Sequence, residues 1–226
     1  MRAFHALRPE GIEWPKREDG APSFRLEHLT AANGIEHAGA HDALVDVRAT
    51  IALARLLKSR NARLFDYLLK LRNKRHVASL LERHGGLARR DQSRACGALV
   101  VPLAEHPSNA NGVIVYDLSV DPAPLMELSP EEIRARVFAS ADDLAEGEER
   151  IPLKVIHLNK SPVLLPANAL KDVSGPHEGE YGEIAARFKI DPAQCRVHWK
   201  WLKDNAGVGV KVAQVFAEAP SAGPAD

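Results

Sequence analysis

The chain has 226 residues, of which 27% are charged, and its 30 Lys and Arg residues balance its 30 Asp and Glu residues. Only Cys96 and Cys195 are present, so the composition excludes a small disulfide-stabilised module and offers no zinc-site spacing. No apolar run approaches the roughly 18 residues of a membrane span, and the first residues do not resemble a signal peptide, so we expect a cytoplasmic protein without membrane association.

Two short helices are predicted in the first 40 residues. The first covers residues 2–7, and a loop broken by several prolines follows it. The second covers residues 23–33 and ends at Gly34. By its spacing alone, Arg25 on this segment is an ordinary surface cation.

A histidine and an aspartate, His41 and Asp46, lie five residues apart at the start of the longest predicted helix. Asp42 is the expected N-cap, and apolar residues recur at steps of three and four to about residue 60. Two helical residues five apart diverge by roughly 140°, so His41 must lie in the preceding loop if both side chains face one cleft. On spacing alone, a capping histidine and a surface aspartate are the simpler interpretation. The expected buried stripe comprises Ala43, Val47, Leu53, Leu56 and Leu57.

Charge is distributed unevenly along the chain. Between residues 48 and 75 there are nine basic residues and one acid, Asp66, whereas residues 127–149 carry eight acids and two bases. The first of these segments is suited to face a polyanion. A basic helix that is merely solvated is the alternative interpretation.

A further helical stretch is expected over residues 61–84. In it, Phe65 and Tyr67 are interleaved with cations that include Arg72 and Lys74. Proteins that bind single-stranded nucleic acids combine phosphate-neutralising cations with flat rings on which bases stack. This pattern therefore favours a nucleic-acid surface over a plain solvated helix.

From Gly97 onward, helical periodicity gives way to short β-rich runs, which suggest a small barrel or sandwich. Between the second and third of these runs, Ser129 and Pro130 predict an N-capped helix that ends near residue 140. The closing region, residues 181–217, again has a helical pattern. The expected strands cover residues 98–103, 113–118 and 153–158.

These stretches together resemble the bacterial exodeoxyribonuclease I family, in which the H-x4-D pattern of His41 and Asp46 is the last signature of a DEDD-type 3′→5′ exonuclease. The resemblance implies an α+β chain with the C-terminal part of a ribonuclease H-like exonuclease domain and then an SH3-like β-rich domain. The implied parts are the exonuclease portion 1–62, a helical connector 63–96, the SH3-like domain 97–217 and a tail 218–226. The matching stretches are residues 7–12, 23–30, 41–46, 63–68, 72–74, 101–103, 106–107, 113–118 and 157–164.

The resemblance also implies roles for individual residues in the hydrolysis of single-stranded DNA by two Mg²⁺ ions. Asp46 matches a metal ligand, and His41 matches the general base. No D-x-E pattern on an apolar strand precedes His41, so we expect an internal portion of the family's chain with an incomplete metal site and little activity alone. The implied DNA contacts are Arg2, Arg25, Tyr67, Arg72, Lys74, Asn159 and Lys160.

Two interpretations remain open for this chain. The first is a partial exonuclease, which a separate chain completes. It would also bind single-strand-binding protein. The second is a non-catalytic module for single-stranded DNA binding or for protein interaction. One departure from the family bears on both, because residues 82–97 are basic and not strand-like, so that the first strand of the SH3-like domain is expected to be missing or altered.

Overall fold

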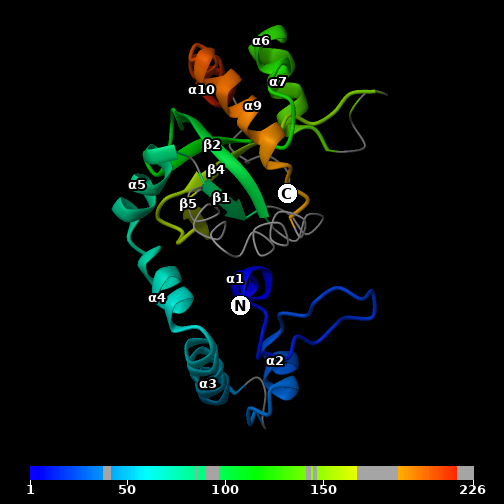
Figure 1. Cartoon of the computed structure of the whole chain (residues 1–226), viewed down its shortest axis with the longest axis vertical. Helices are drawn as coiled ribbons and strands as arrows, with labels where there is room; N and C mark the ends of the chain where they lie inside the picture. The colour runs from blue at the N-terminus through cyan, green and yellow to red at the C-terminus, as the bar shows by residue number, and fades with distance from the viewer. Residues whose placement is uncertain are drawn as a thin grey trace. The chain divides into compact units, whose positions relative to one another are not determined.

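The computed structural model describes residues 1–37, 42–84, 86–89, 97–140, 144, 147–166 and 188–217. The chain divides into two compact units, Met1–Lys70 and Leu71–Asp226. In Figure 1 the first unit runs from blue to cyan, and the second runs from cyan to red.

In its described residues, the first unit consists of helices and connecting loops. Helix α3 packs against α2 and against α4. A small apolar core forms around Phe4, Ile12 and Leu57, and Trp14 packs against it. The Trp14 indole donates a hydrogen bond to the carbonyl oxygen of Pro9 at 2.9 Å, so this ring anchors the first loop. The helices are α1 (Arg2–Leu7), α2 (Leu26–Ala32), α3 (Ala43–Arg60) and α4 (Ala62–Lys70).

The long helix α3 begins where the sequence predicts but buries a different face. The Asp42 carboxylate accepts hydrogen bonds from two backbone N–H groups of the first turn, which confirms it as the N-cap. The buried residues are Ala49, Leu53 and Leu57, whereas Val47 is exposed, so the predicted stripe was wrong in its first half. Apolar residues lie on two faces of α3, and periodicity alone does not tell which face has a neighbour to pack against.

An antiparallel sheet organises the second unit. In the described residues its strand order is β4-β3-β2-β1-β5. The three strands expected from the sequence correspond to β2, β3 and β4, with ends that differ by at most two residues. Together with the helices, this sheet confirms the α+β class. The strands are β1 (Gly86–Arg89), β2 (Gly97–Glu105), β3 (Gly112–Asp117), β4 (Leu153–His157) and β5 (Leu164–Pro166).

Of the two expectations for the first strand, missing or altered, the first was wrong, because β1 is present inside the sheet. It pairs antiparallel with β2, where Leu87 lies opposite Leu99, and with β5, where Leu87 lies opposite Leu165. The strand is only four residues long. Its structure is stabilised by hydrogen bonding along both edges, a non-local effect that the local composition does not encode.

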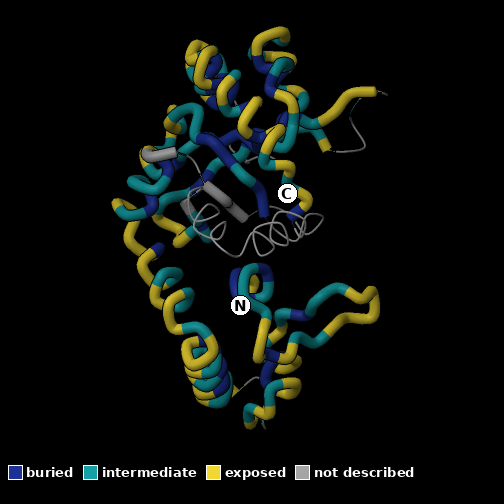
Figure 2. Tube along the Cα trace, viewed as in Figure 1, coloured by how far each residue is buried: buried dark blue, intermediate teal, exposed yellow. Residues whose placement is uncertain are grey.

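Four helices of the second unit, α6, α7, α9 and α10, gather together in Figure 1, while α5 packs against β2 and β5. The main core lies between this group and the sheet and includes the fully buried Tyr116, Ile133 and Val212. In Figure 2 the buried segments of this unit follow the strands and the inner sides of its helices. The helices are α5 (Lys74–His84), α6 (Pro124–Glu127), α7 (Pro130–Phe138), α9 (Pro192–Asp204) and α10 (Val208–Ala217).

The predicted start of α7 is confirmed in detail. The Ser129 hydroxyl accepts from the Glu132 backbone N–H at 3.2 Å, and a Glu132 carboxylate oxygen accepts from the Ser129 backbone N–H at 2.7 Å. This reciprocal capping box satisfies two donors that an uncapped helix would leave without partners. None of the helices in the described ranges combines the length and the apolar character needed to cross a bilayer.

Candidate functional site

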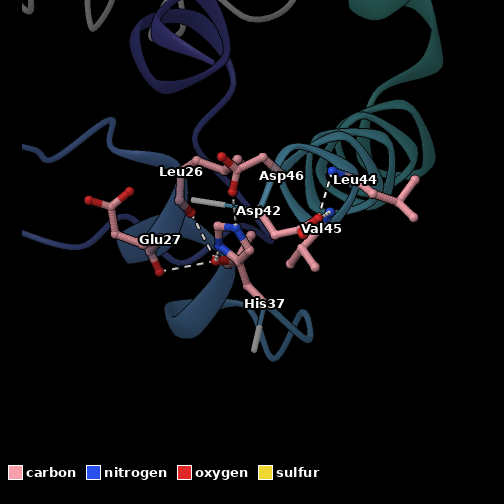
Figure 3. A network of polar contacts seen from close by, with 8 residues as sticks. Leu26, Glu27, His37, Asp42, Leu44, Val45 and Asp46 are labelled. Atoms are coloured by element: carbon pink, nitrogen blue, oxygen red, sulfur yellow. Dashed lines mark hydrogen bonds and ion pairs between the residues drawn. The ribbon is translucent and has the colours of Figure 1, made fainter. Parts of the chain in front are cut away.

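Asp46 lies in the first turn of α3, where the helix dipole favours a negative charge. Its side chain is 41% exposed, and its Oδ1 atom lies 2.7 Å from Nε2 of His37. The His37 side chain is only 7% exposed and comes from the loop that follows α2. In Figure 3 the imidazole points directly at the carboxylate.

Thr30 contacts the other nitrogen of the same imidazole. Its Oγ1 atom lies 3.2 Å from Nδ1 of His37, and it donates toward the carbonyl oxygens of Leu26 and Glu27 at 2.9 and 3.0 Å. Thr30 is fully buried within α2. A continuous polar chain therefore links the backbone of α2, through Thr30 and His37, to Asp46 on α3 (Figure 3).

His41 lies outside the described residues, so its convergence with Asp46 stays a prediction. Among the described residues, the histidine that contacts Asp46 is His37, which the sequence did not single out. The two residues are nine apart in the sequence, and only Asp46 lies in a helix, so neither helical nor strand periodicity connects them. The one sequence signal that could have indicated His37 as a partner of Asp46 is that it is a second histidine shortly before α3.

The metal-binding capacity of the described residues is limited. Among them, no three His, Cys, Asp or Glu side chains form a group that could hold a metal ion. A pair of Mg²⁺ ions needs several oxygen ligands, usually carboxylates. Asp46 fits as one oxygen ligand of such a site, but the described part of the chain does not supply the further ligands that a complete site needs.

In the first unit, two of the residues matched to DNA contacts are exposed cations and one is an aromatic residue. The Arg2 guanidinium lies 5.4 Å from the centroid of the Phe24 ring, a cation–π distance. The Arg25 side chain, at the N-cap of α2, is 73% exposed and lies 3.9 Å from a Glu27 oxygen. Tyr67 on α4 is half-buried, and this burial raises the pKa of its phenol to about 12.

In the second unit, Asn111 brings Lys74 close to the turn that follows β4. The Lys74 ammonium, at the start of α5, donates to Oδ1 of Asn111 at 3.3 Å, and the Asn111 carbonyl accepts from the Leu158 backbone N–H at 2.8 Å. Asn159 and Lys160 come next in that turn and are exposed. Sequence reasoning missed Asn111, because its role depends on two contacts that are distant in the chain.

His157, at the end of β4, has surroundings that disfavour its protonated form. Burial, then the Lys160 ammonium and then His106 lower its pKa below the usual histidine value. Its Nδ1 atom lies 3.3 Å from the amide nitrogen of Asn109, which fits a neutral ring that accepts a hydrogen bond. Arg72, which precedes α5, is exposed and adds a cation to the same unit.

Comparison with known proteins decides the family. Residues 72–218 match the model of the Exonuclease I SH3-like domain. Over its whole length the chain is 45% identical to exodeoxyribonuclease I of Escherichia coli strain K12, of which it covers 46%. The chain belongs to the exodeoxyribonuclease I family. The resemblance inferred from the sequence is thereby confirmed.

Solved structures of the exodeoxyribonuclease I family agree with this assignment. E. coli Exonuclease I in complex with a dA16 oligonucleotide is 45% identical and superimposes with a TM-score of 0.85, covering 100% of this chain and 47% of that one. An ExoI/SSB-Ct complex is 43% identical with a TM-score of 0.81, over 97% of this chain and 46% of that one. The chain thus spans slightly less than half the length of these exodeoxyribonuclease I relatives.

Proposed function

We propose that this chain forms part of a 3′→5′ exodeoxyribonuclease that hydrolyses single-stranded DNA. The observation that carries the proposal is 45% identity over the whole chain to an exodeoxyribonuclease I. The match spans the whole chain, and a relative of the same fold has been described in complex with a dA16 oligonucleotide. The proposed parts are the exonuclease portion 1–62, the connector 63–96, the SH3-like domain 97–217 and the tail 218–226.

For the chemistry, we propose that Asp46 is a ligand of Mg²⁺, which prefers oxygen ligands and keeps several of its waters. His41 is proposed as the general base, because an imidazole titrates near neutral pH and can take a proton from the attacking water. Since the described residues offer Asp46 without a surrounding group of ligands, the remaining carboxylates must be supplied by other residues. The chain alone is therefore proposed to have negligible nuclease activity.

The DNA path is proposed to follow the exposed cations of both units. Lys and Arg neutralise phosphates, an asparagine amide hydrogen-bonds phosphate or sugar, and an aromatic ring stacks on a base; none of these contacts needs to recognise the sequence. The exposure of the Arg25 side chain, at 73%, and the gathering of Lys74 with the 159–160 turn support this proposal. The proposed contacts are Arg2, Arg25, Tyr67, Arg72, Lys74, Asn159 and Lys160.

The test is a reconstitution assay on 5′-labelled single-stranded DNA with Mg²⁺. We expect the chain alone to leave the DNA intact. We expect shortening from the 3′ end when the chain is mixed with a polypeptide made of the regions of E. coli exodeoxyribonuclease I that it does not cover. Asp46→Ala should abolish that activity. Asp66→Ala is the matched control, because Asp66 is another half-exposed aspartate of the same unit, 3.8 Å from Lys58.

Two outcomes would contradict these proposals. Robust hydrolysis by the chain alone would disprove the incomplete metal site. Failure of the mixture to cut, together with failure of the chain to bind the DNA, would disprove the nuclease proposal as a whole.

The second candidate function is a non-catalytic module that binds single-stranded DNA. It is favoured by the fact that no three His, Cys, Asp or Glu side chains of the described residues form a group that could hold a metal ion. Binding of DNA that persists in the mixture without any shortening would select this candidate. Binding should also be unaffected by Asp46→Ala in that case.

Proposed partners and location follow from the family. A relative has been described as an ExoI/SSB-Ct complex, so we propose single-strand-binding protein as a partner, alongside a separate chain that completes the exonuclease domain. The cytoplasm remains the proposed location, and Cys195, a buried free thiol, is compatible with a reducing compartment.

A further inference from the structure

We infer that His37 is a positioning residue that fixes the orientation of the Asp46 carboxylate. The inference rests on the proposed function, in which that carboxylate binds a metal ion. It assigns to His37 a role separate from that of a general base. Three features of the first unit carry it: the hydrogen bond to Asp46, the enclosure of the imidazole, and its anchoring to α2.

The hydrogen bond to Asp46 requires a proton on Nε2 of His37. An ionised carboxylate only accepts hydrogen bonds, so Nε2 of His37 must donate to Oδ1 of Asp46 across the observed 2.7 Å. Such a short contact to a charged acceptor is among the stronger hydrogen bonds in proteins. While it is formed, Nε2 has no lone pair with which to take a proton from water. His37 therefore holds the carboxylate and does not act as a base through this nitrogen.

The surroundings of the imidazole make it a rigid support. Its side chain is 7% exposed, compared with 41% for Asp46. On the opposite side, Nδ1 contacts the hydroxyl of the fully buried Thr30, which is itself bonded to two carbonyl groups of α2. The ring cannot turn without breaking contacts at both nitrogens. Through His37 and Thr30, the half-exposed Asp46 carboxylate on α3 is therefore held in a fixed position relative to helix α2.

The chemical consequence concerns the geometry of metal binding. Carboxylates that bind metals are commonly oriented by a hydrogen bond from a neighbouring group, and loss of that group typically costs 10- to 100-fold in metal affinity or activity. Without His37, the Asp46 carboxylate would lose the hydrogen bond to its Oδ1 atom, and its rotamer would be less strongly restrained. A purely architectural role, in which His37 merely joins α2 to α3, would instead affect stability and leave the Asp46 rotamer unchanged.

The first test is nuclear magnetic resonance on the full 226-residue chain in the absence of metal. We expect a proton on Nε2 of His37 in ¹⁵N-labelled protein and a single χ1 rotamer for Asp46. In His37→Ala the Asp46 rotamers should average, and in His37→Gln, which keeps an amide donor, a single rotamer should be largely restored. His28→Gln is the matched control, because His28 contacts Ser23 rather than Asp46.

Each result either supports or overturns the inference. An unprotonated Nε2 in the wild-type chain would overturn it even if His37→Ala failed to fold. An unchanged Asp46 rotamer in a folded His37→Ala variant would also overturn it, as would a His37→Gln variant that behaves like His37→Ala.

A second measurement uses the reconstituted mixture with Mn²⁺ as the probe ion. His37→Ala should raise the Mn²⁺ concentration needed for half-maximal activity by about 10- to 100-fold, with partial rescue by His37→Gln. An unchanged Mn²⁺ requirement would overturn the inference. If the wild-type mixture is itself inactive, the proposed function fails, while the resonance experiment still decides the role of His37.

Discussion

Tyr67 combines a ring suited to base stacking with a phenol that stays uncharged. Burial raises the pKa of this phenol from the usual 10.0 to about 12, so the ring is neutral at physiological pH and does not repel phosphates. The neutral phenol contributes stability that is fully present below about pH 10. This contribution is lost as the pH rises through about 12, because the unfolded chain releases its proton first.

For DNA binding we expect the ring of Tyr67, and not its hydroxyl, to matter. Tyr67→Ala should weaken the binding of a single-stranded oligonucleotide by about 1–3 kcal/mol, the usual cost of losing one stacked base. Tyr67→Phe should leave the affinity nearly unchanged. Fluorescence anisotropy titrations of the three proteins measure this difference. Equal losses in the two variants would show that the hydroxyl, not stacking, makes the contact.

Local residue chemistry also explains which parts of the fold could be predicted. The caps at Asp42 and Ser129 were predictable because each cap is made by residues two or three positions away. The role of His37 was not, since it depends on a contact between residues nine apart that belong to no common element. Asp46 could be assigned to a metal site only through its resemblance to a family motif.

At the scale of elements, the capping box of α7 makes a contribution to the free energy of unfolding that depends on pH. The hydrogen bonds from the backbone and the hydroxyl of Ser129 lower the pKa of Glu132 below its usual value. The stability that comes from this lowered pKa is therefore present above the unfolded-state value of 4.5 and is lost as the pH falls through the folded-state pKa.

We expect Ser129→Ala to lower the free energy of unfolding by about 1 kcal/mol at neutral pH, the typical cost of losing an N-cap. The loss should shrink in acid, where Glu132 is protonated in both proteins. Urea denaturation at neutral and acidic pH measures both effects. A loss that does not change with pH would mean that Glu132 takes no part in the cap.

Helix α3 has a second apolar face that the described residues leave exposed. Leu44, Val47 and Ile51 are 58%, 54% and 45% exposed and follow one another at helical spacing. Contiguous apolar surface of this kind promotes association. The sequence pattern showed that α3 was apolar, but the choice between its two faces depends on which neighbours are present.

Replacing all three residues of this face by glutamine should reduce self-association of the chain without lowering its free energy of unfolding. Light scattering and urea denaturation measure the two quantities. Leu53 on the same helix is buried and serves as the contrast. Leu53→Ala should lower the free energy of unfolding by about 2–5 kcal/mol. A stability loss from the triple replacement as large as that from Leu53→Ala would show that this face is already packed.

At the scale of the whole molecule, a formal charge of zero conceals a basic part that begins on α3 and reaches α5, and an acidic part around α7. None of the proposed DNA contacts falls in the acidic stretch: Tyr67, Arg72 and Lys74 lie in the basic part, Asn159 and Lys160 lie in the turn after β4, and Arg2 and Arg25 lie on α1 and at the start of α2. Because association with DNA releases counterions from the neutralised phosphates, the affinity should fall steeply as salt is added.

Lys74→Ala should lower the slope of log affinity against log salt by about 0.7, the value for one phosphate of a single strand. Arg196→Ala removes an exposed cation of α9 and serves as the control, with no expected change in slope. Anisotropy titrations over a range of salt concentrations provide the slopes. Equal changes in both variants would indicate a diffuse charge effect instead of a contact at Lys74.

The position of β1 has a consequence for how the sheet opens. Among the described strands, β5 pairs with β1 and with no other strand, while β1 alone joins it to β2. Any fluctuation that detaches β1 must therefore release β5 as well. Backbone amides of β5 should exchange with deuterium no more slowly than those of β1, whereas amides shared by β2 and β3 stay protected for longer.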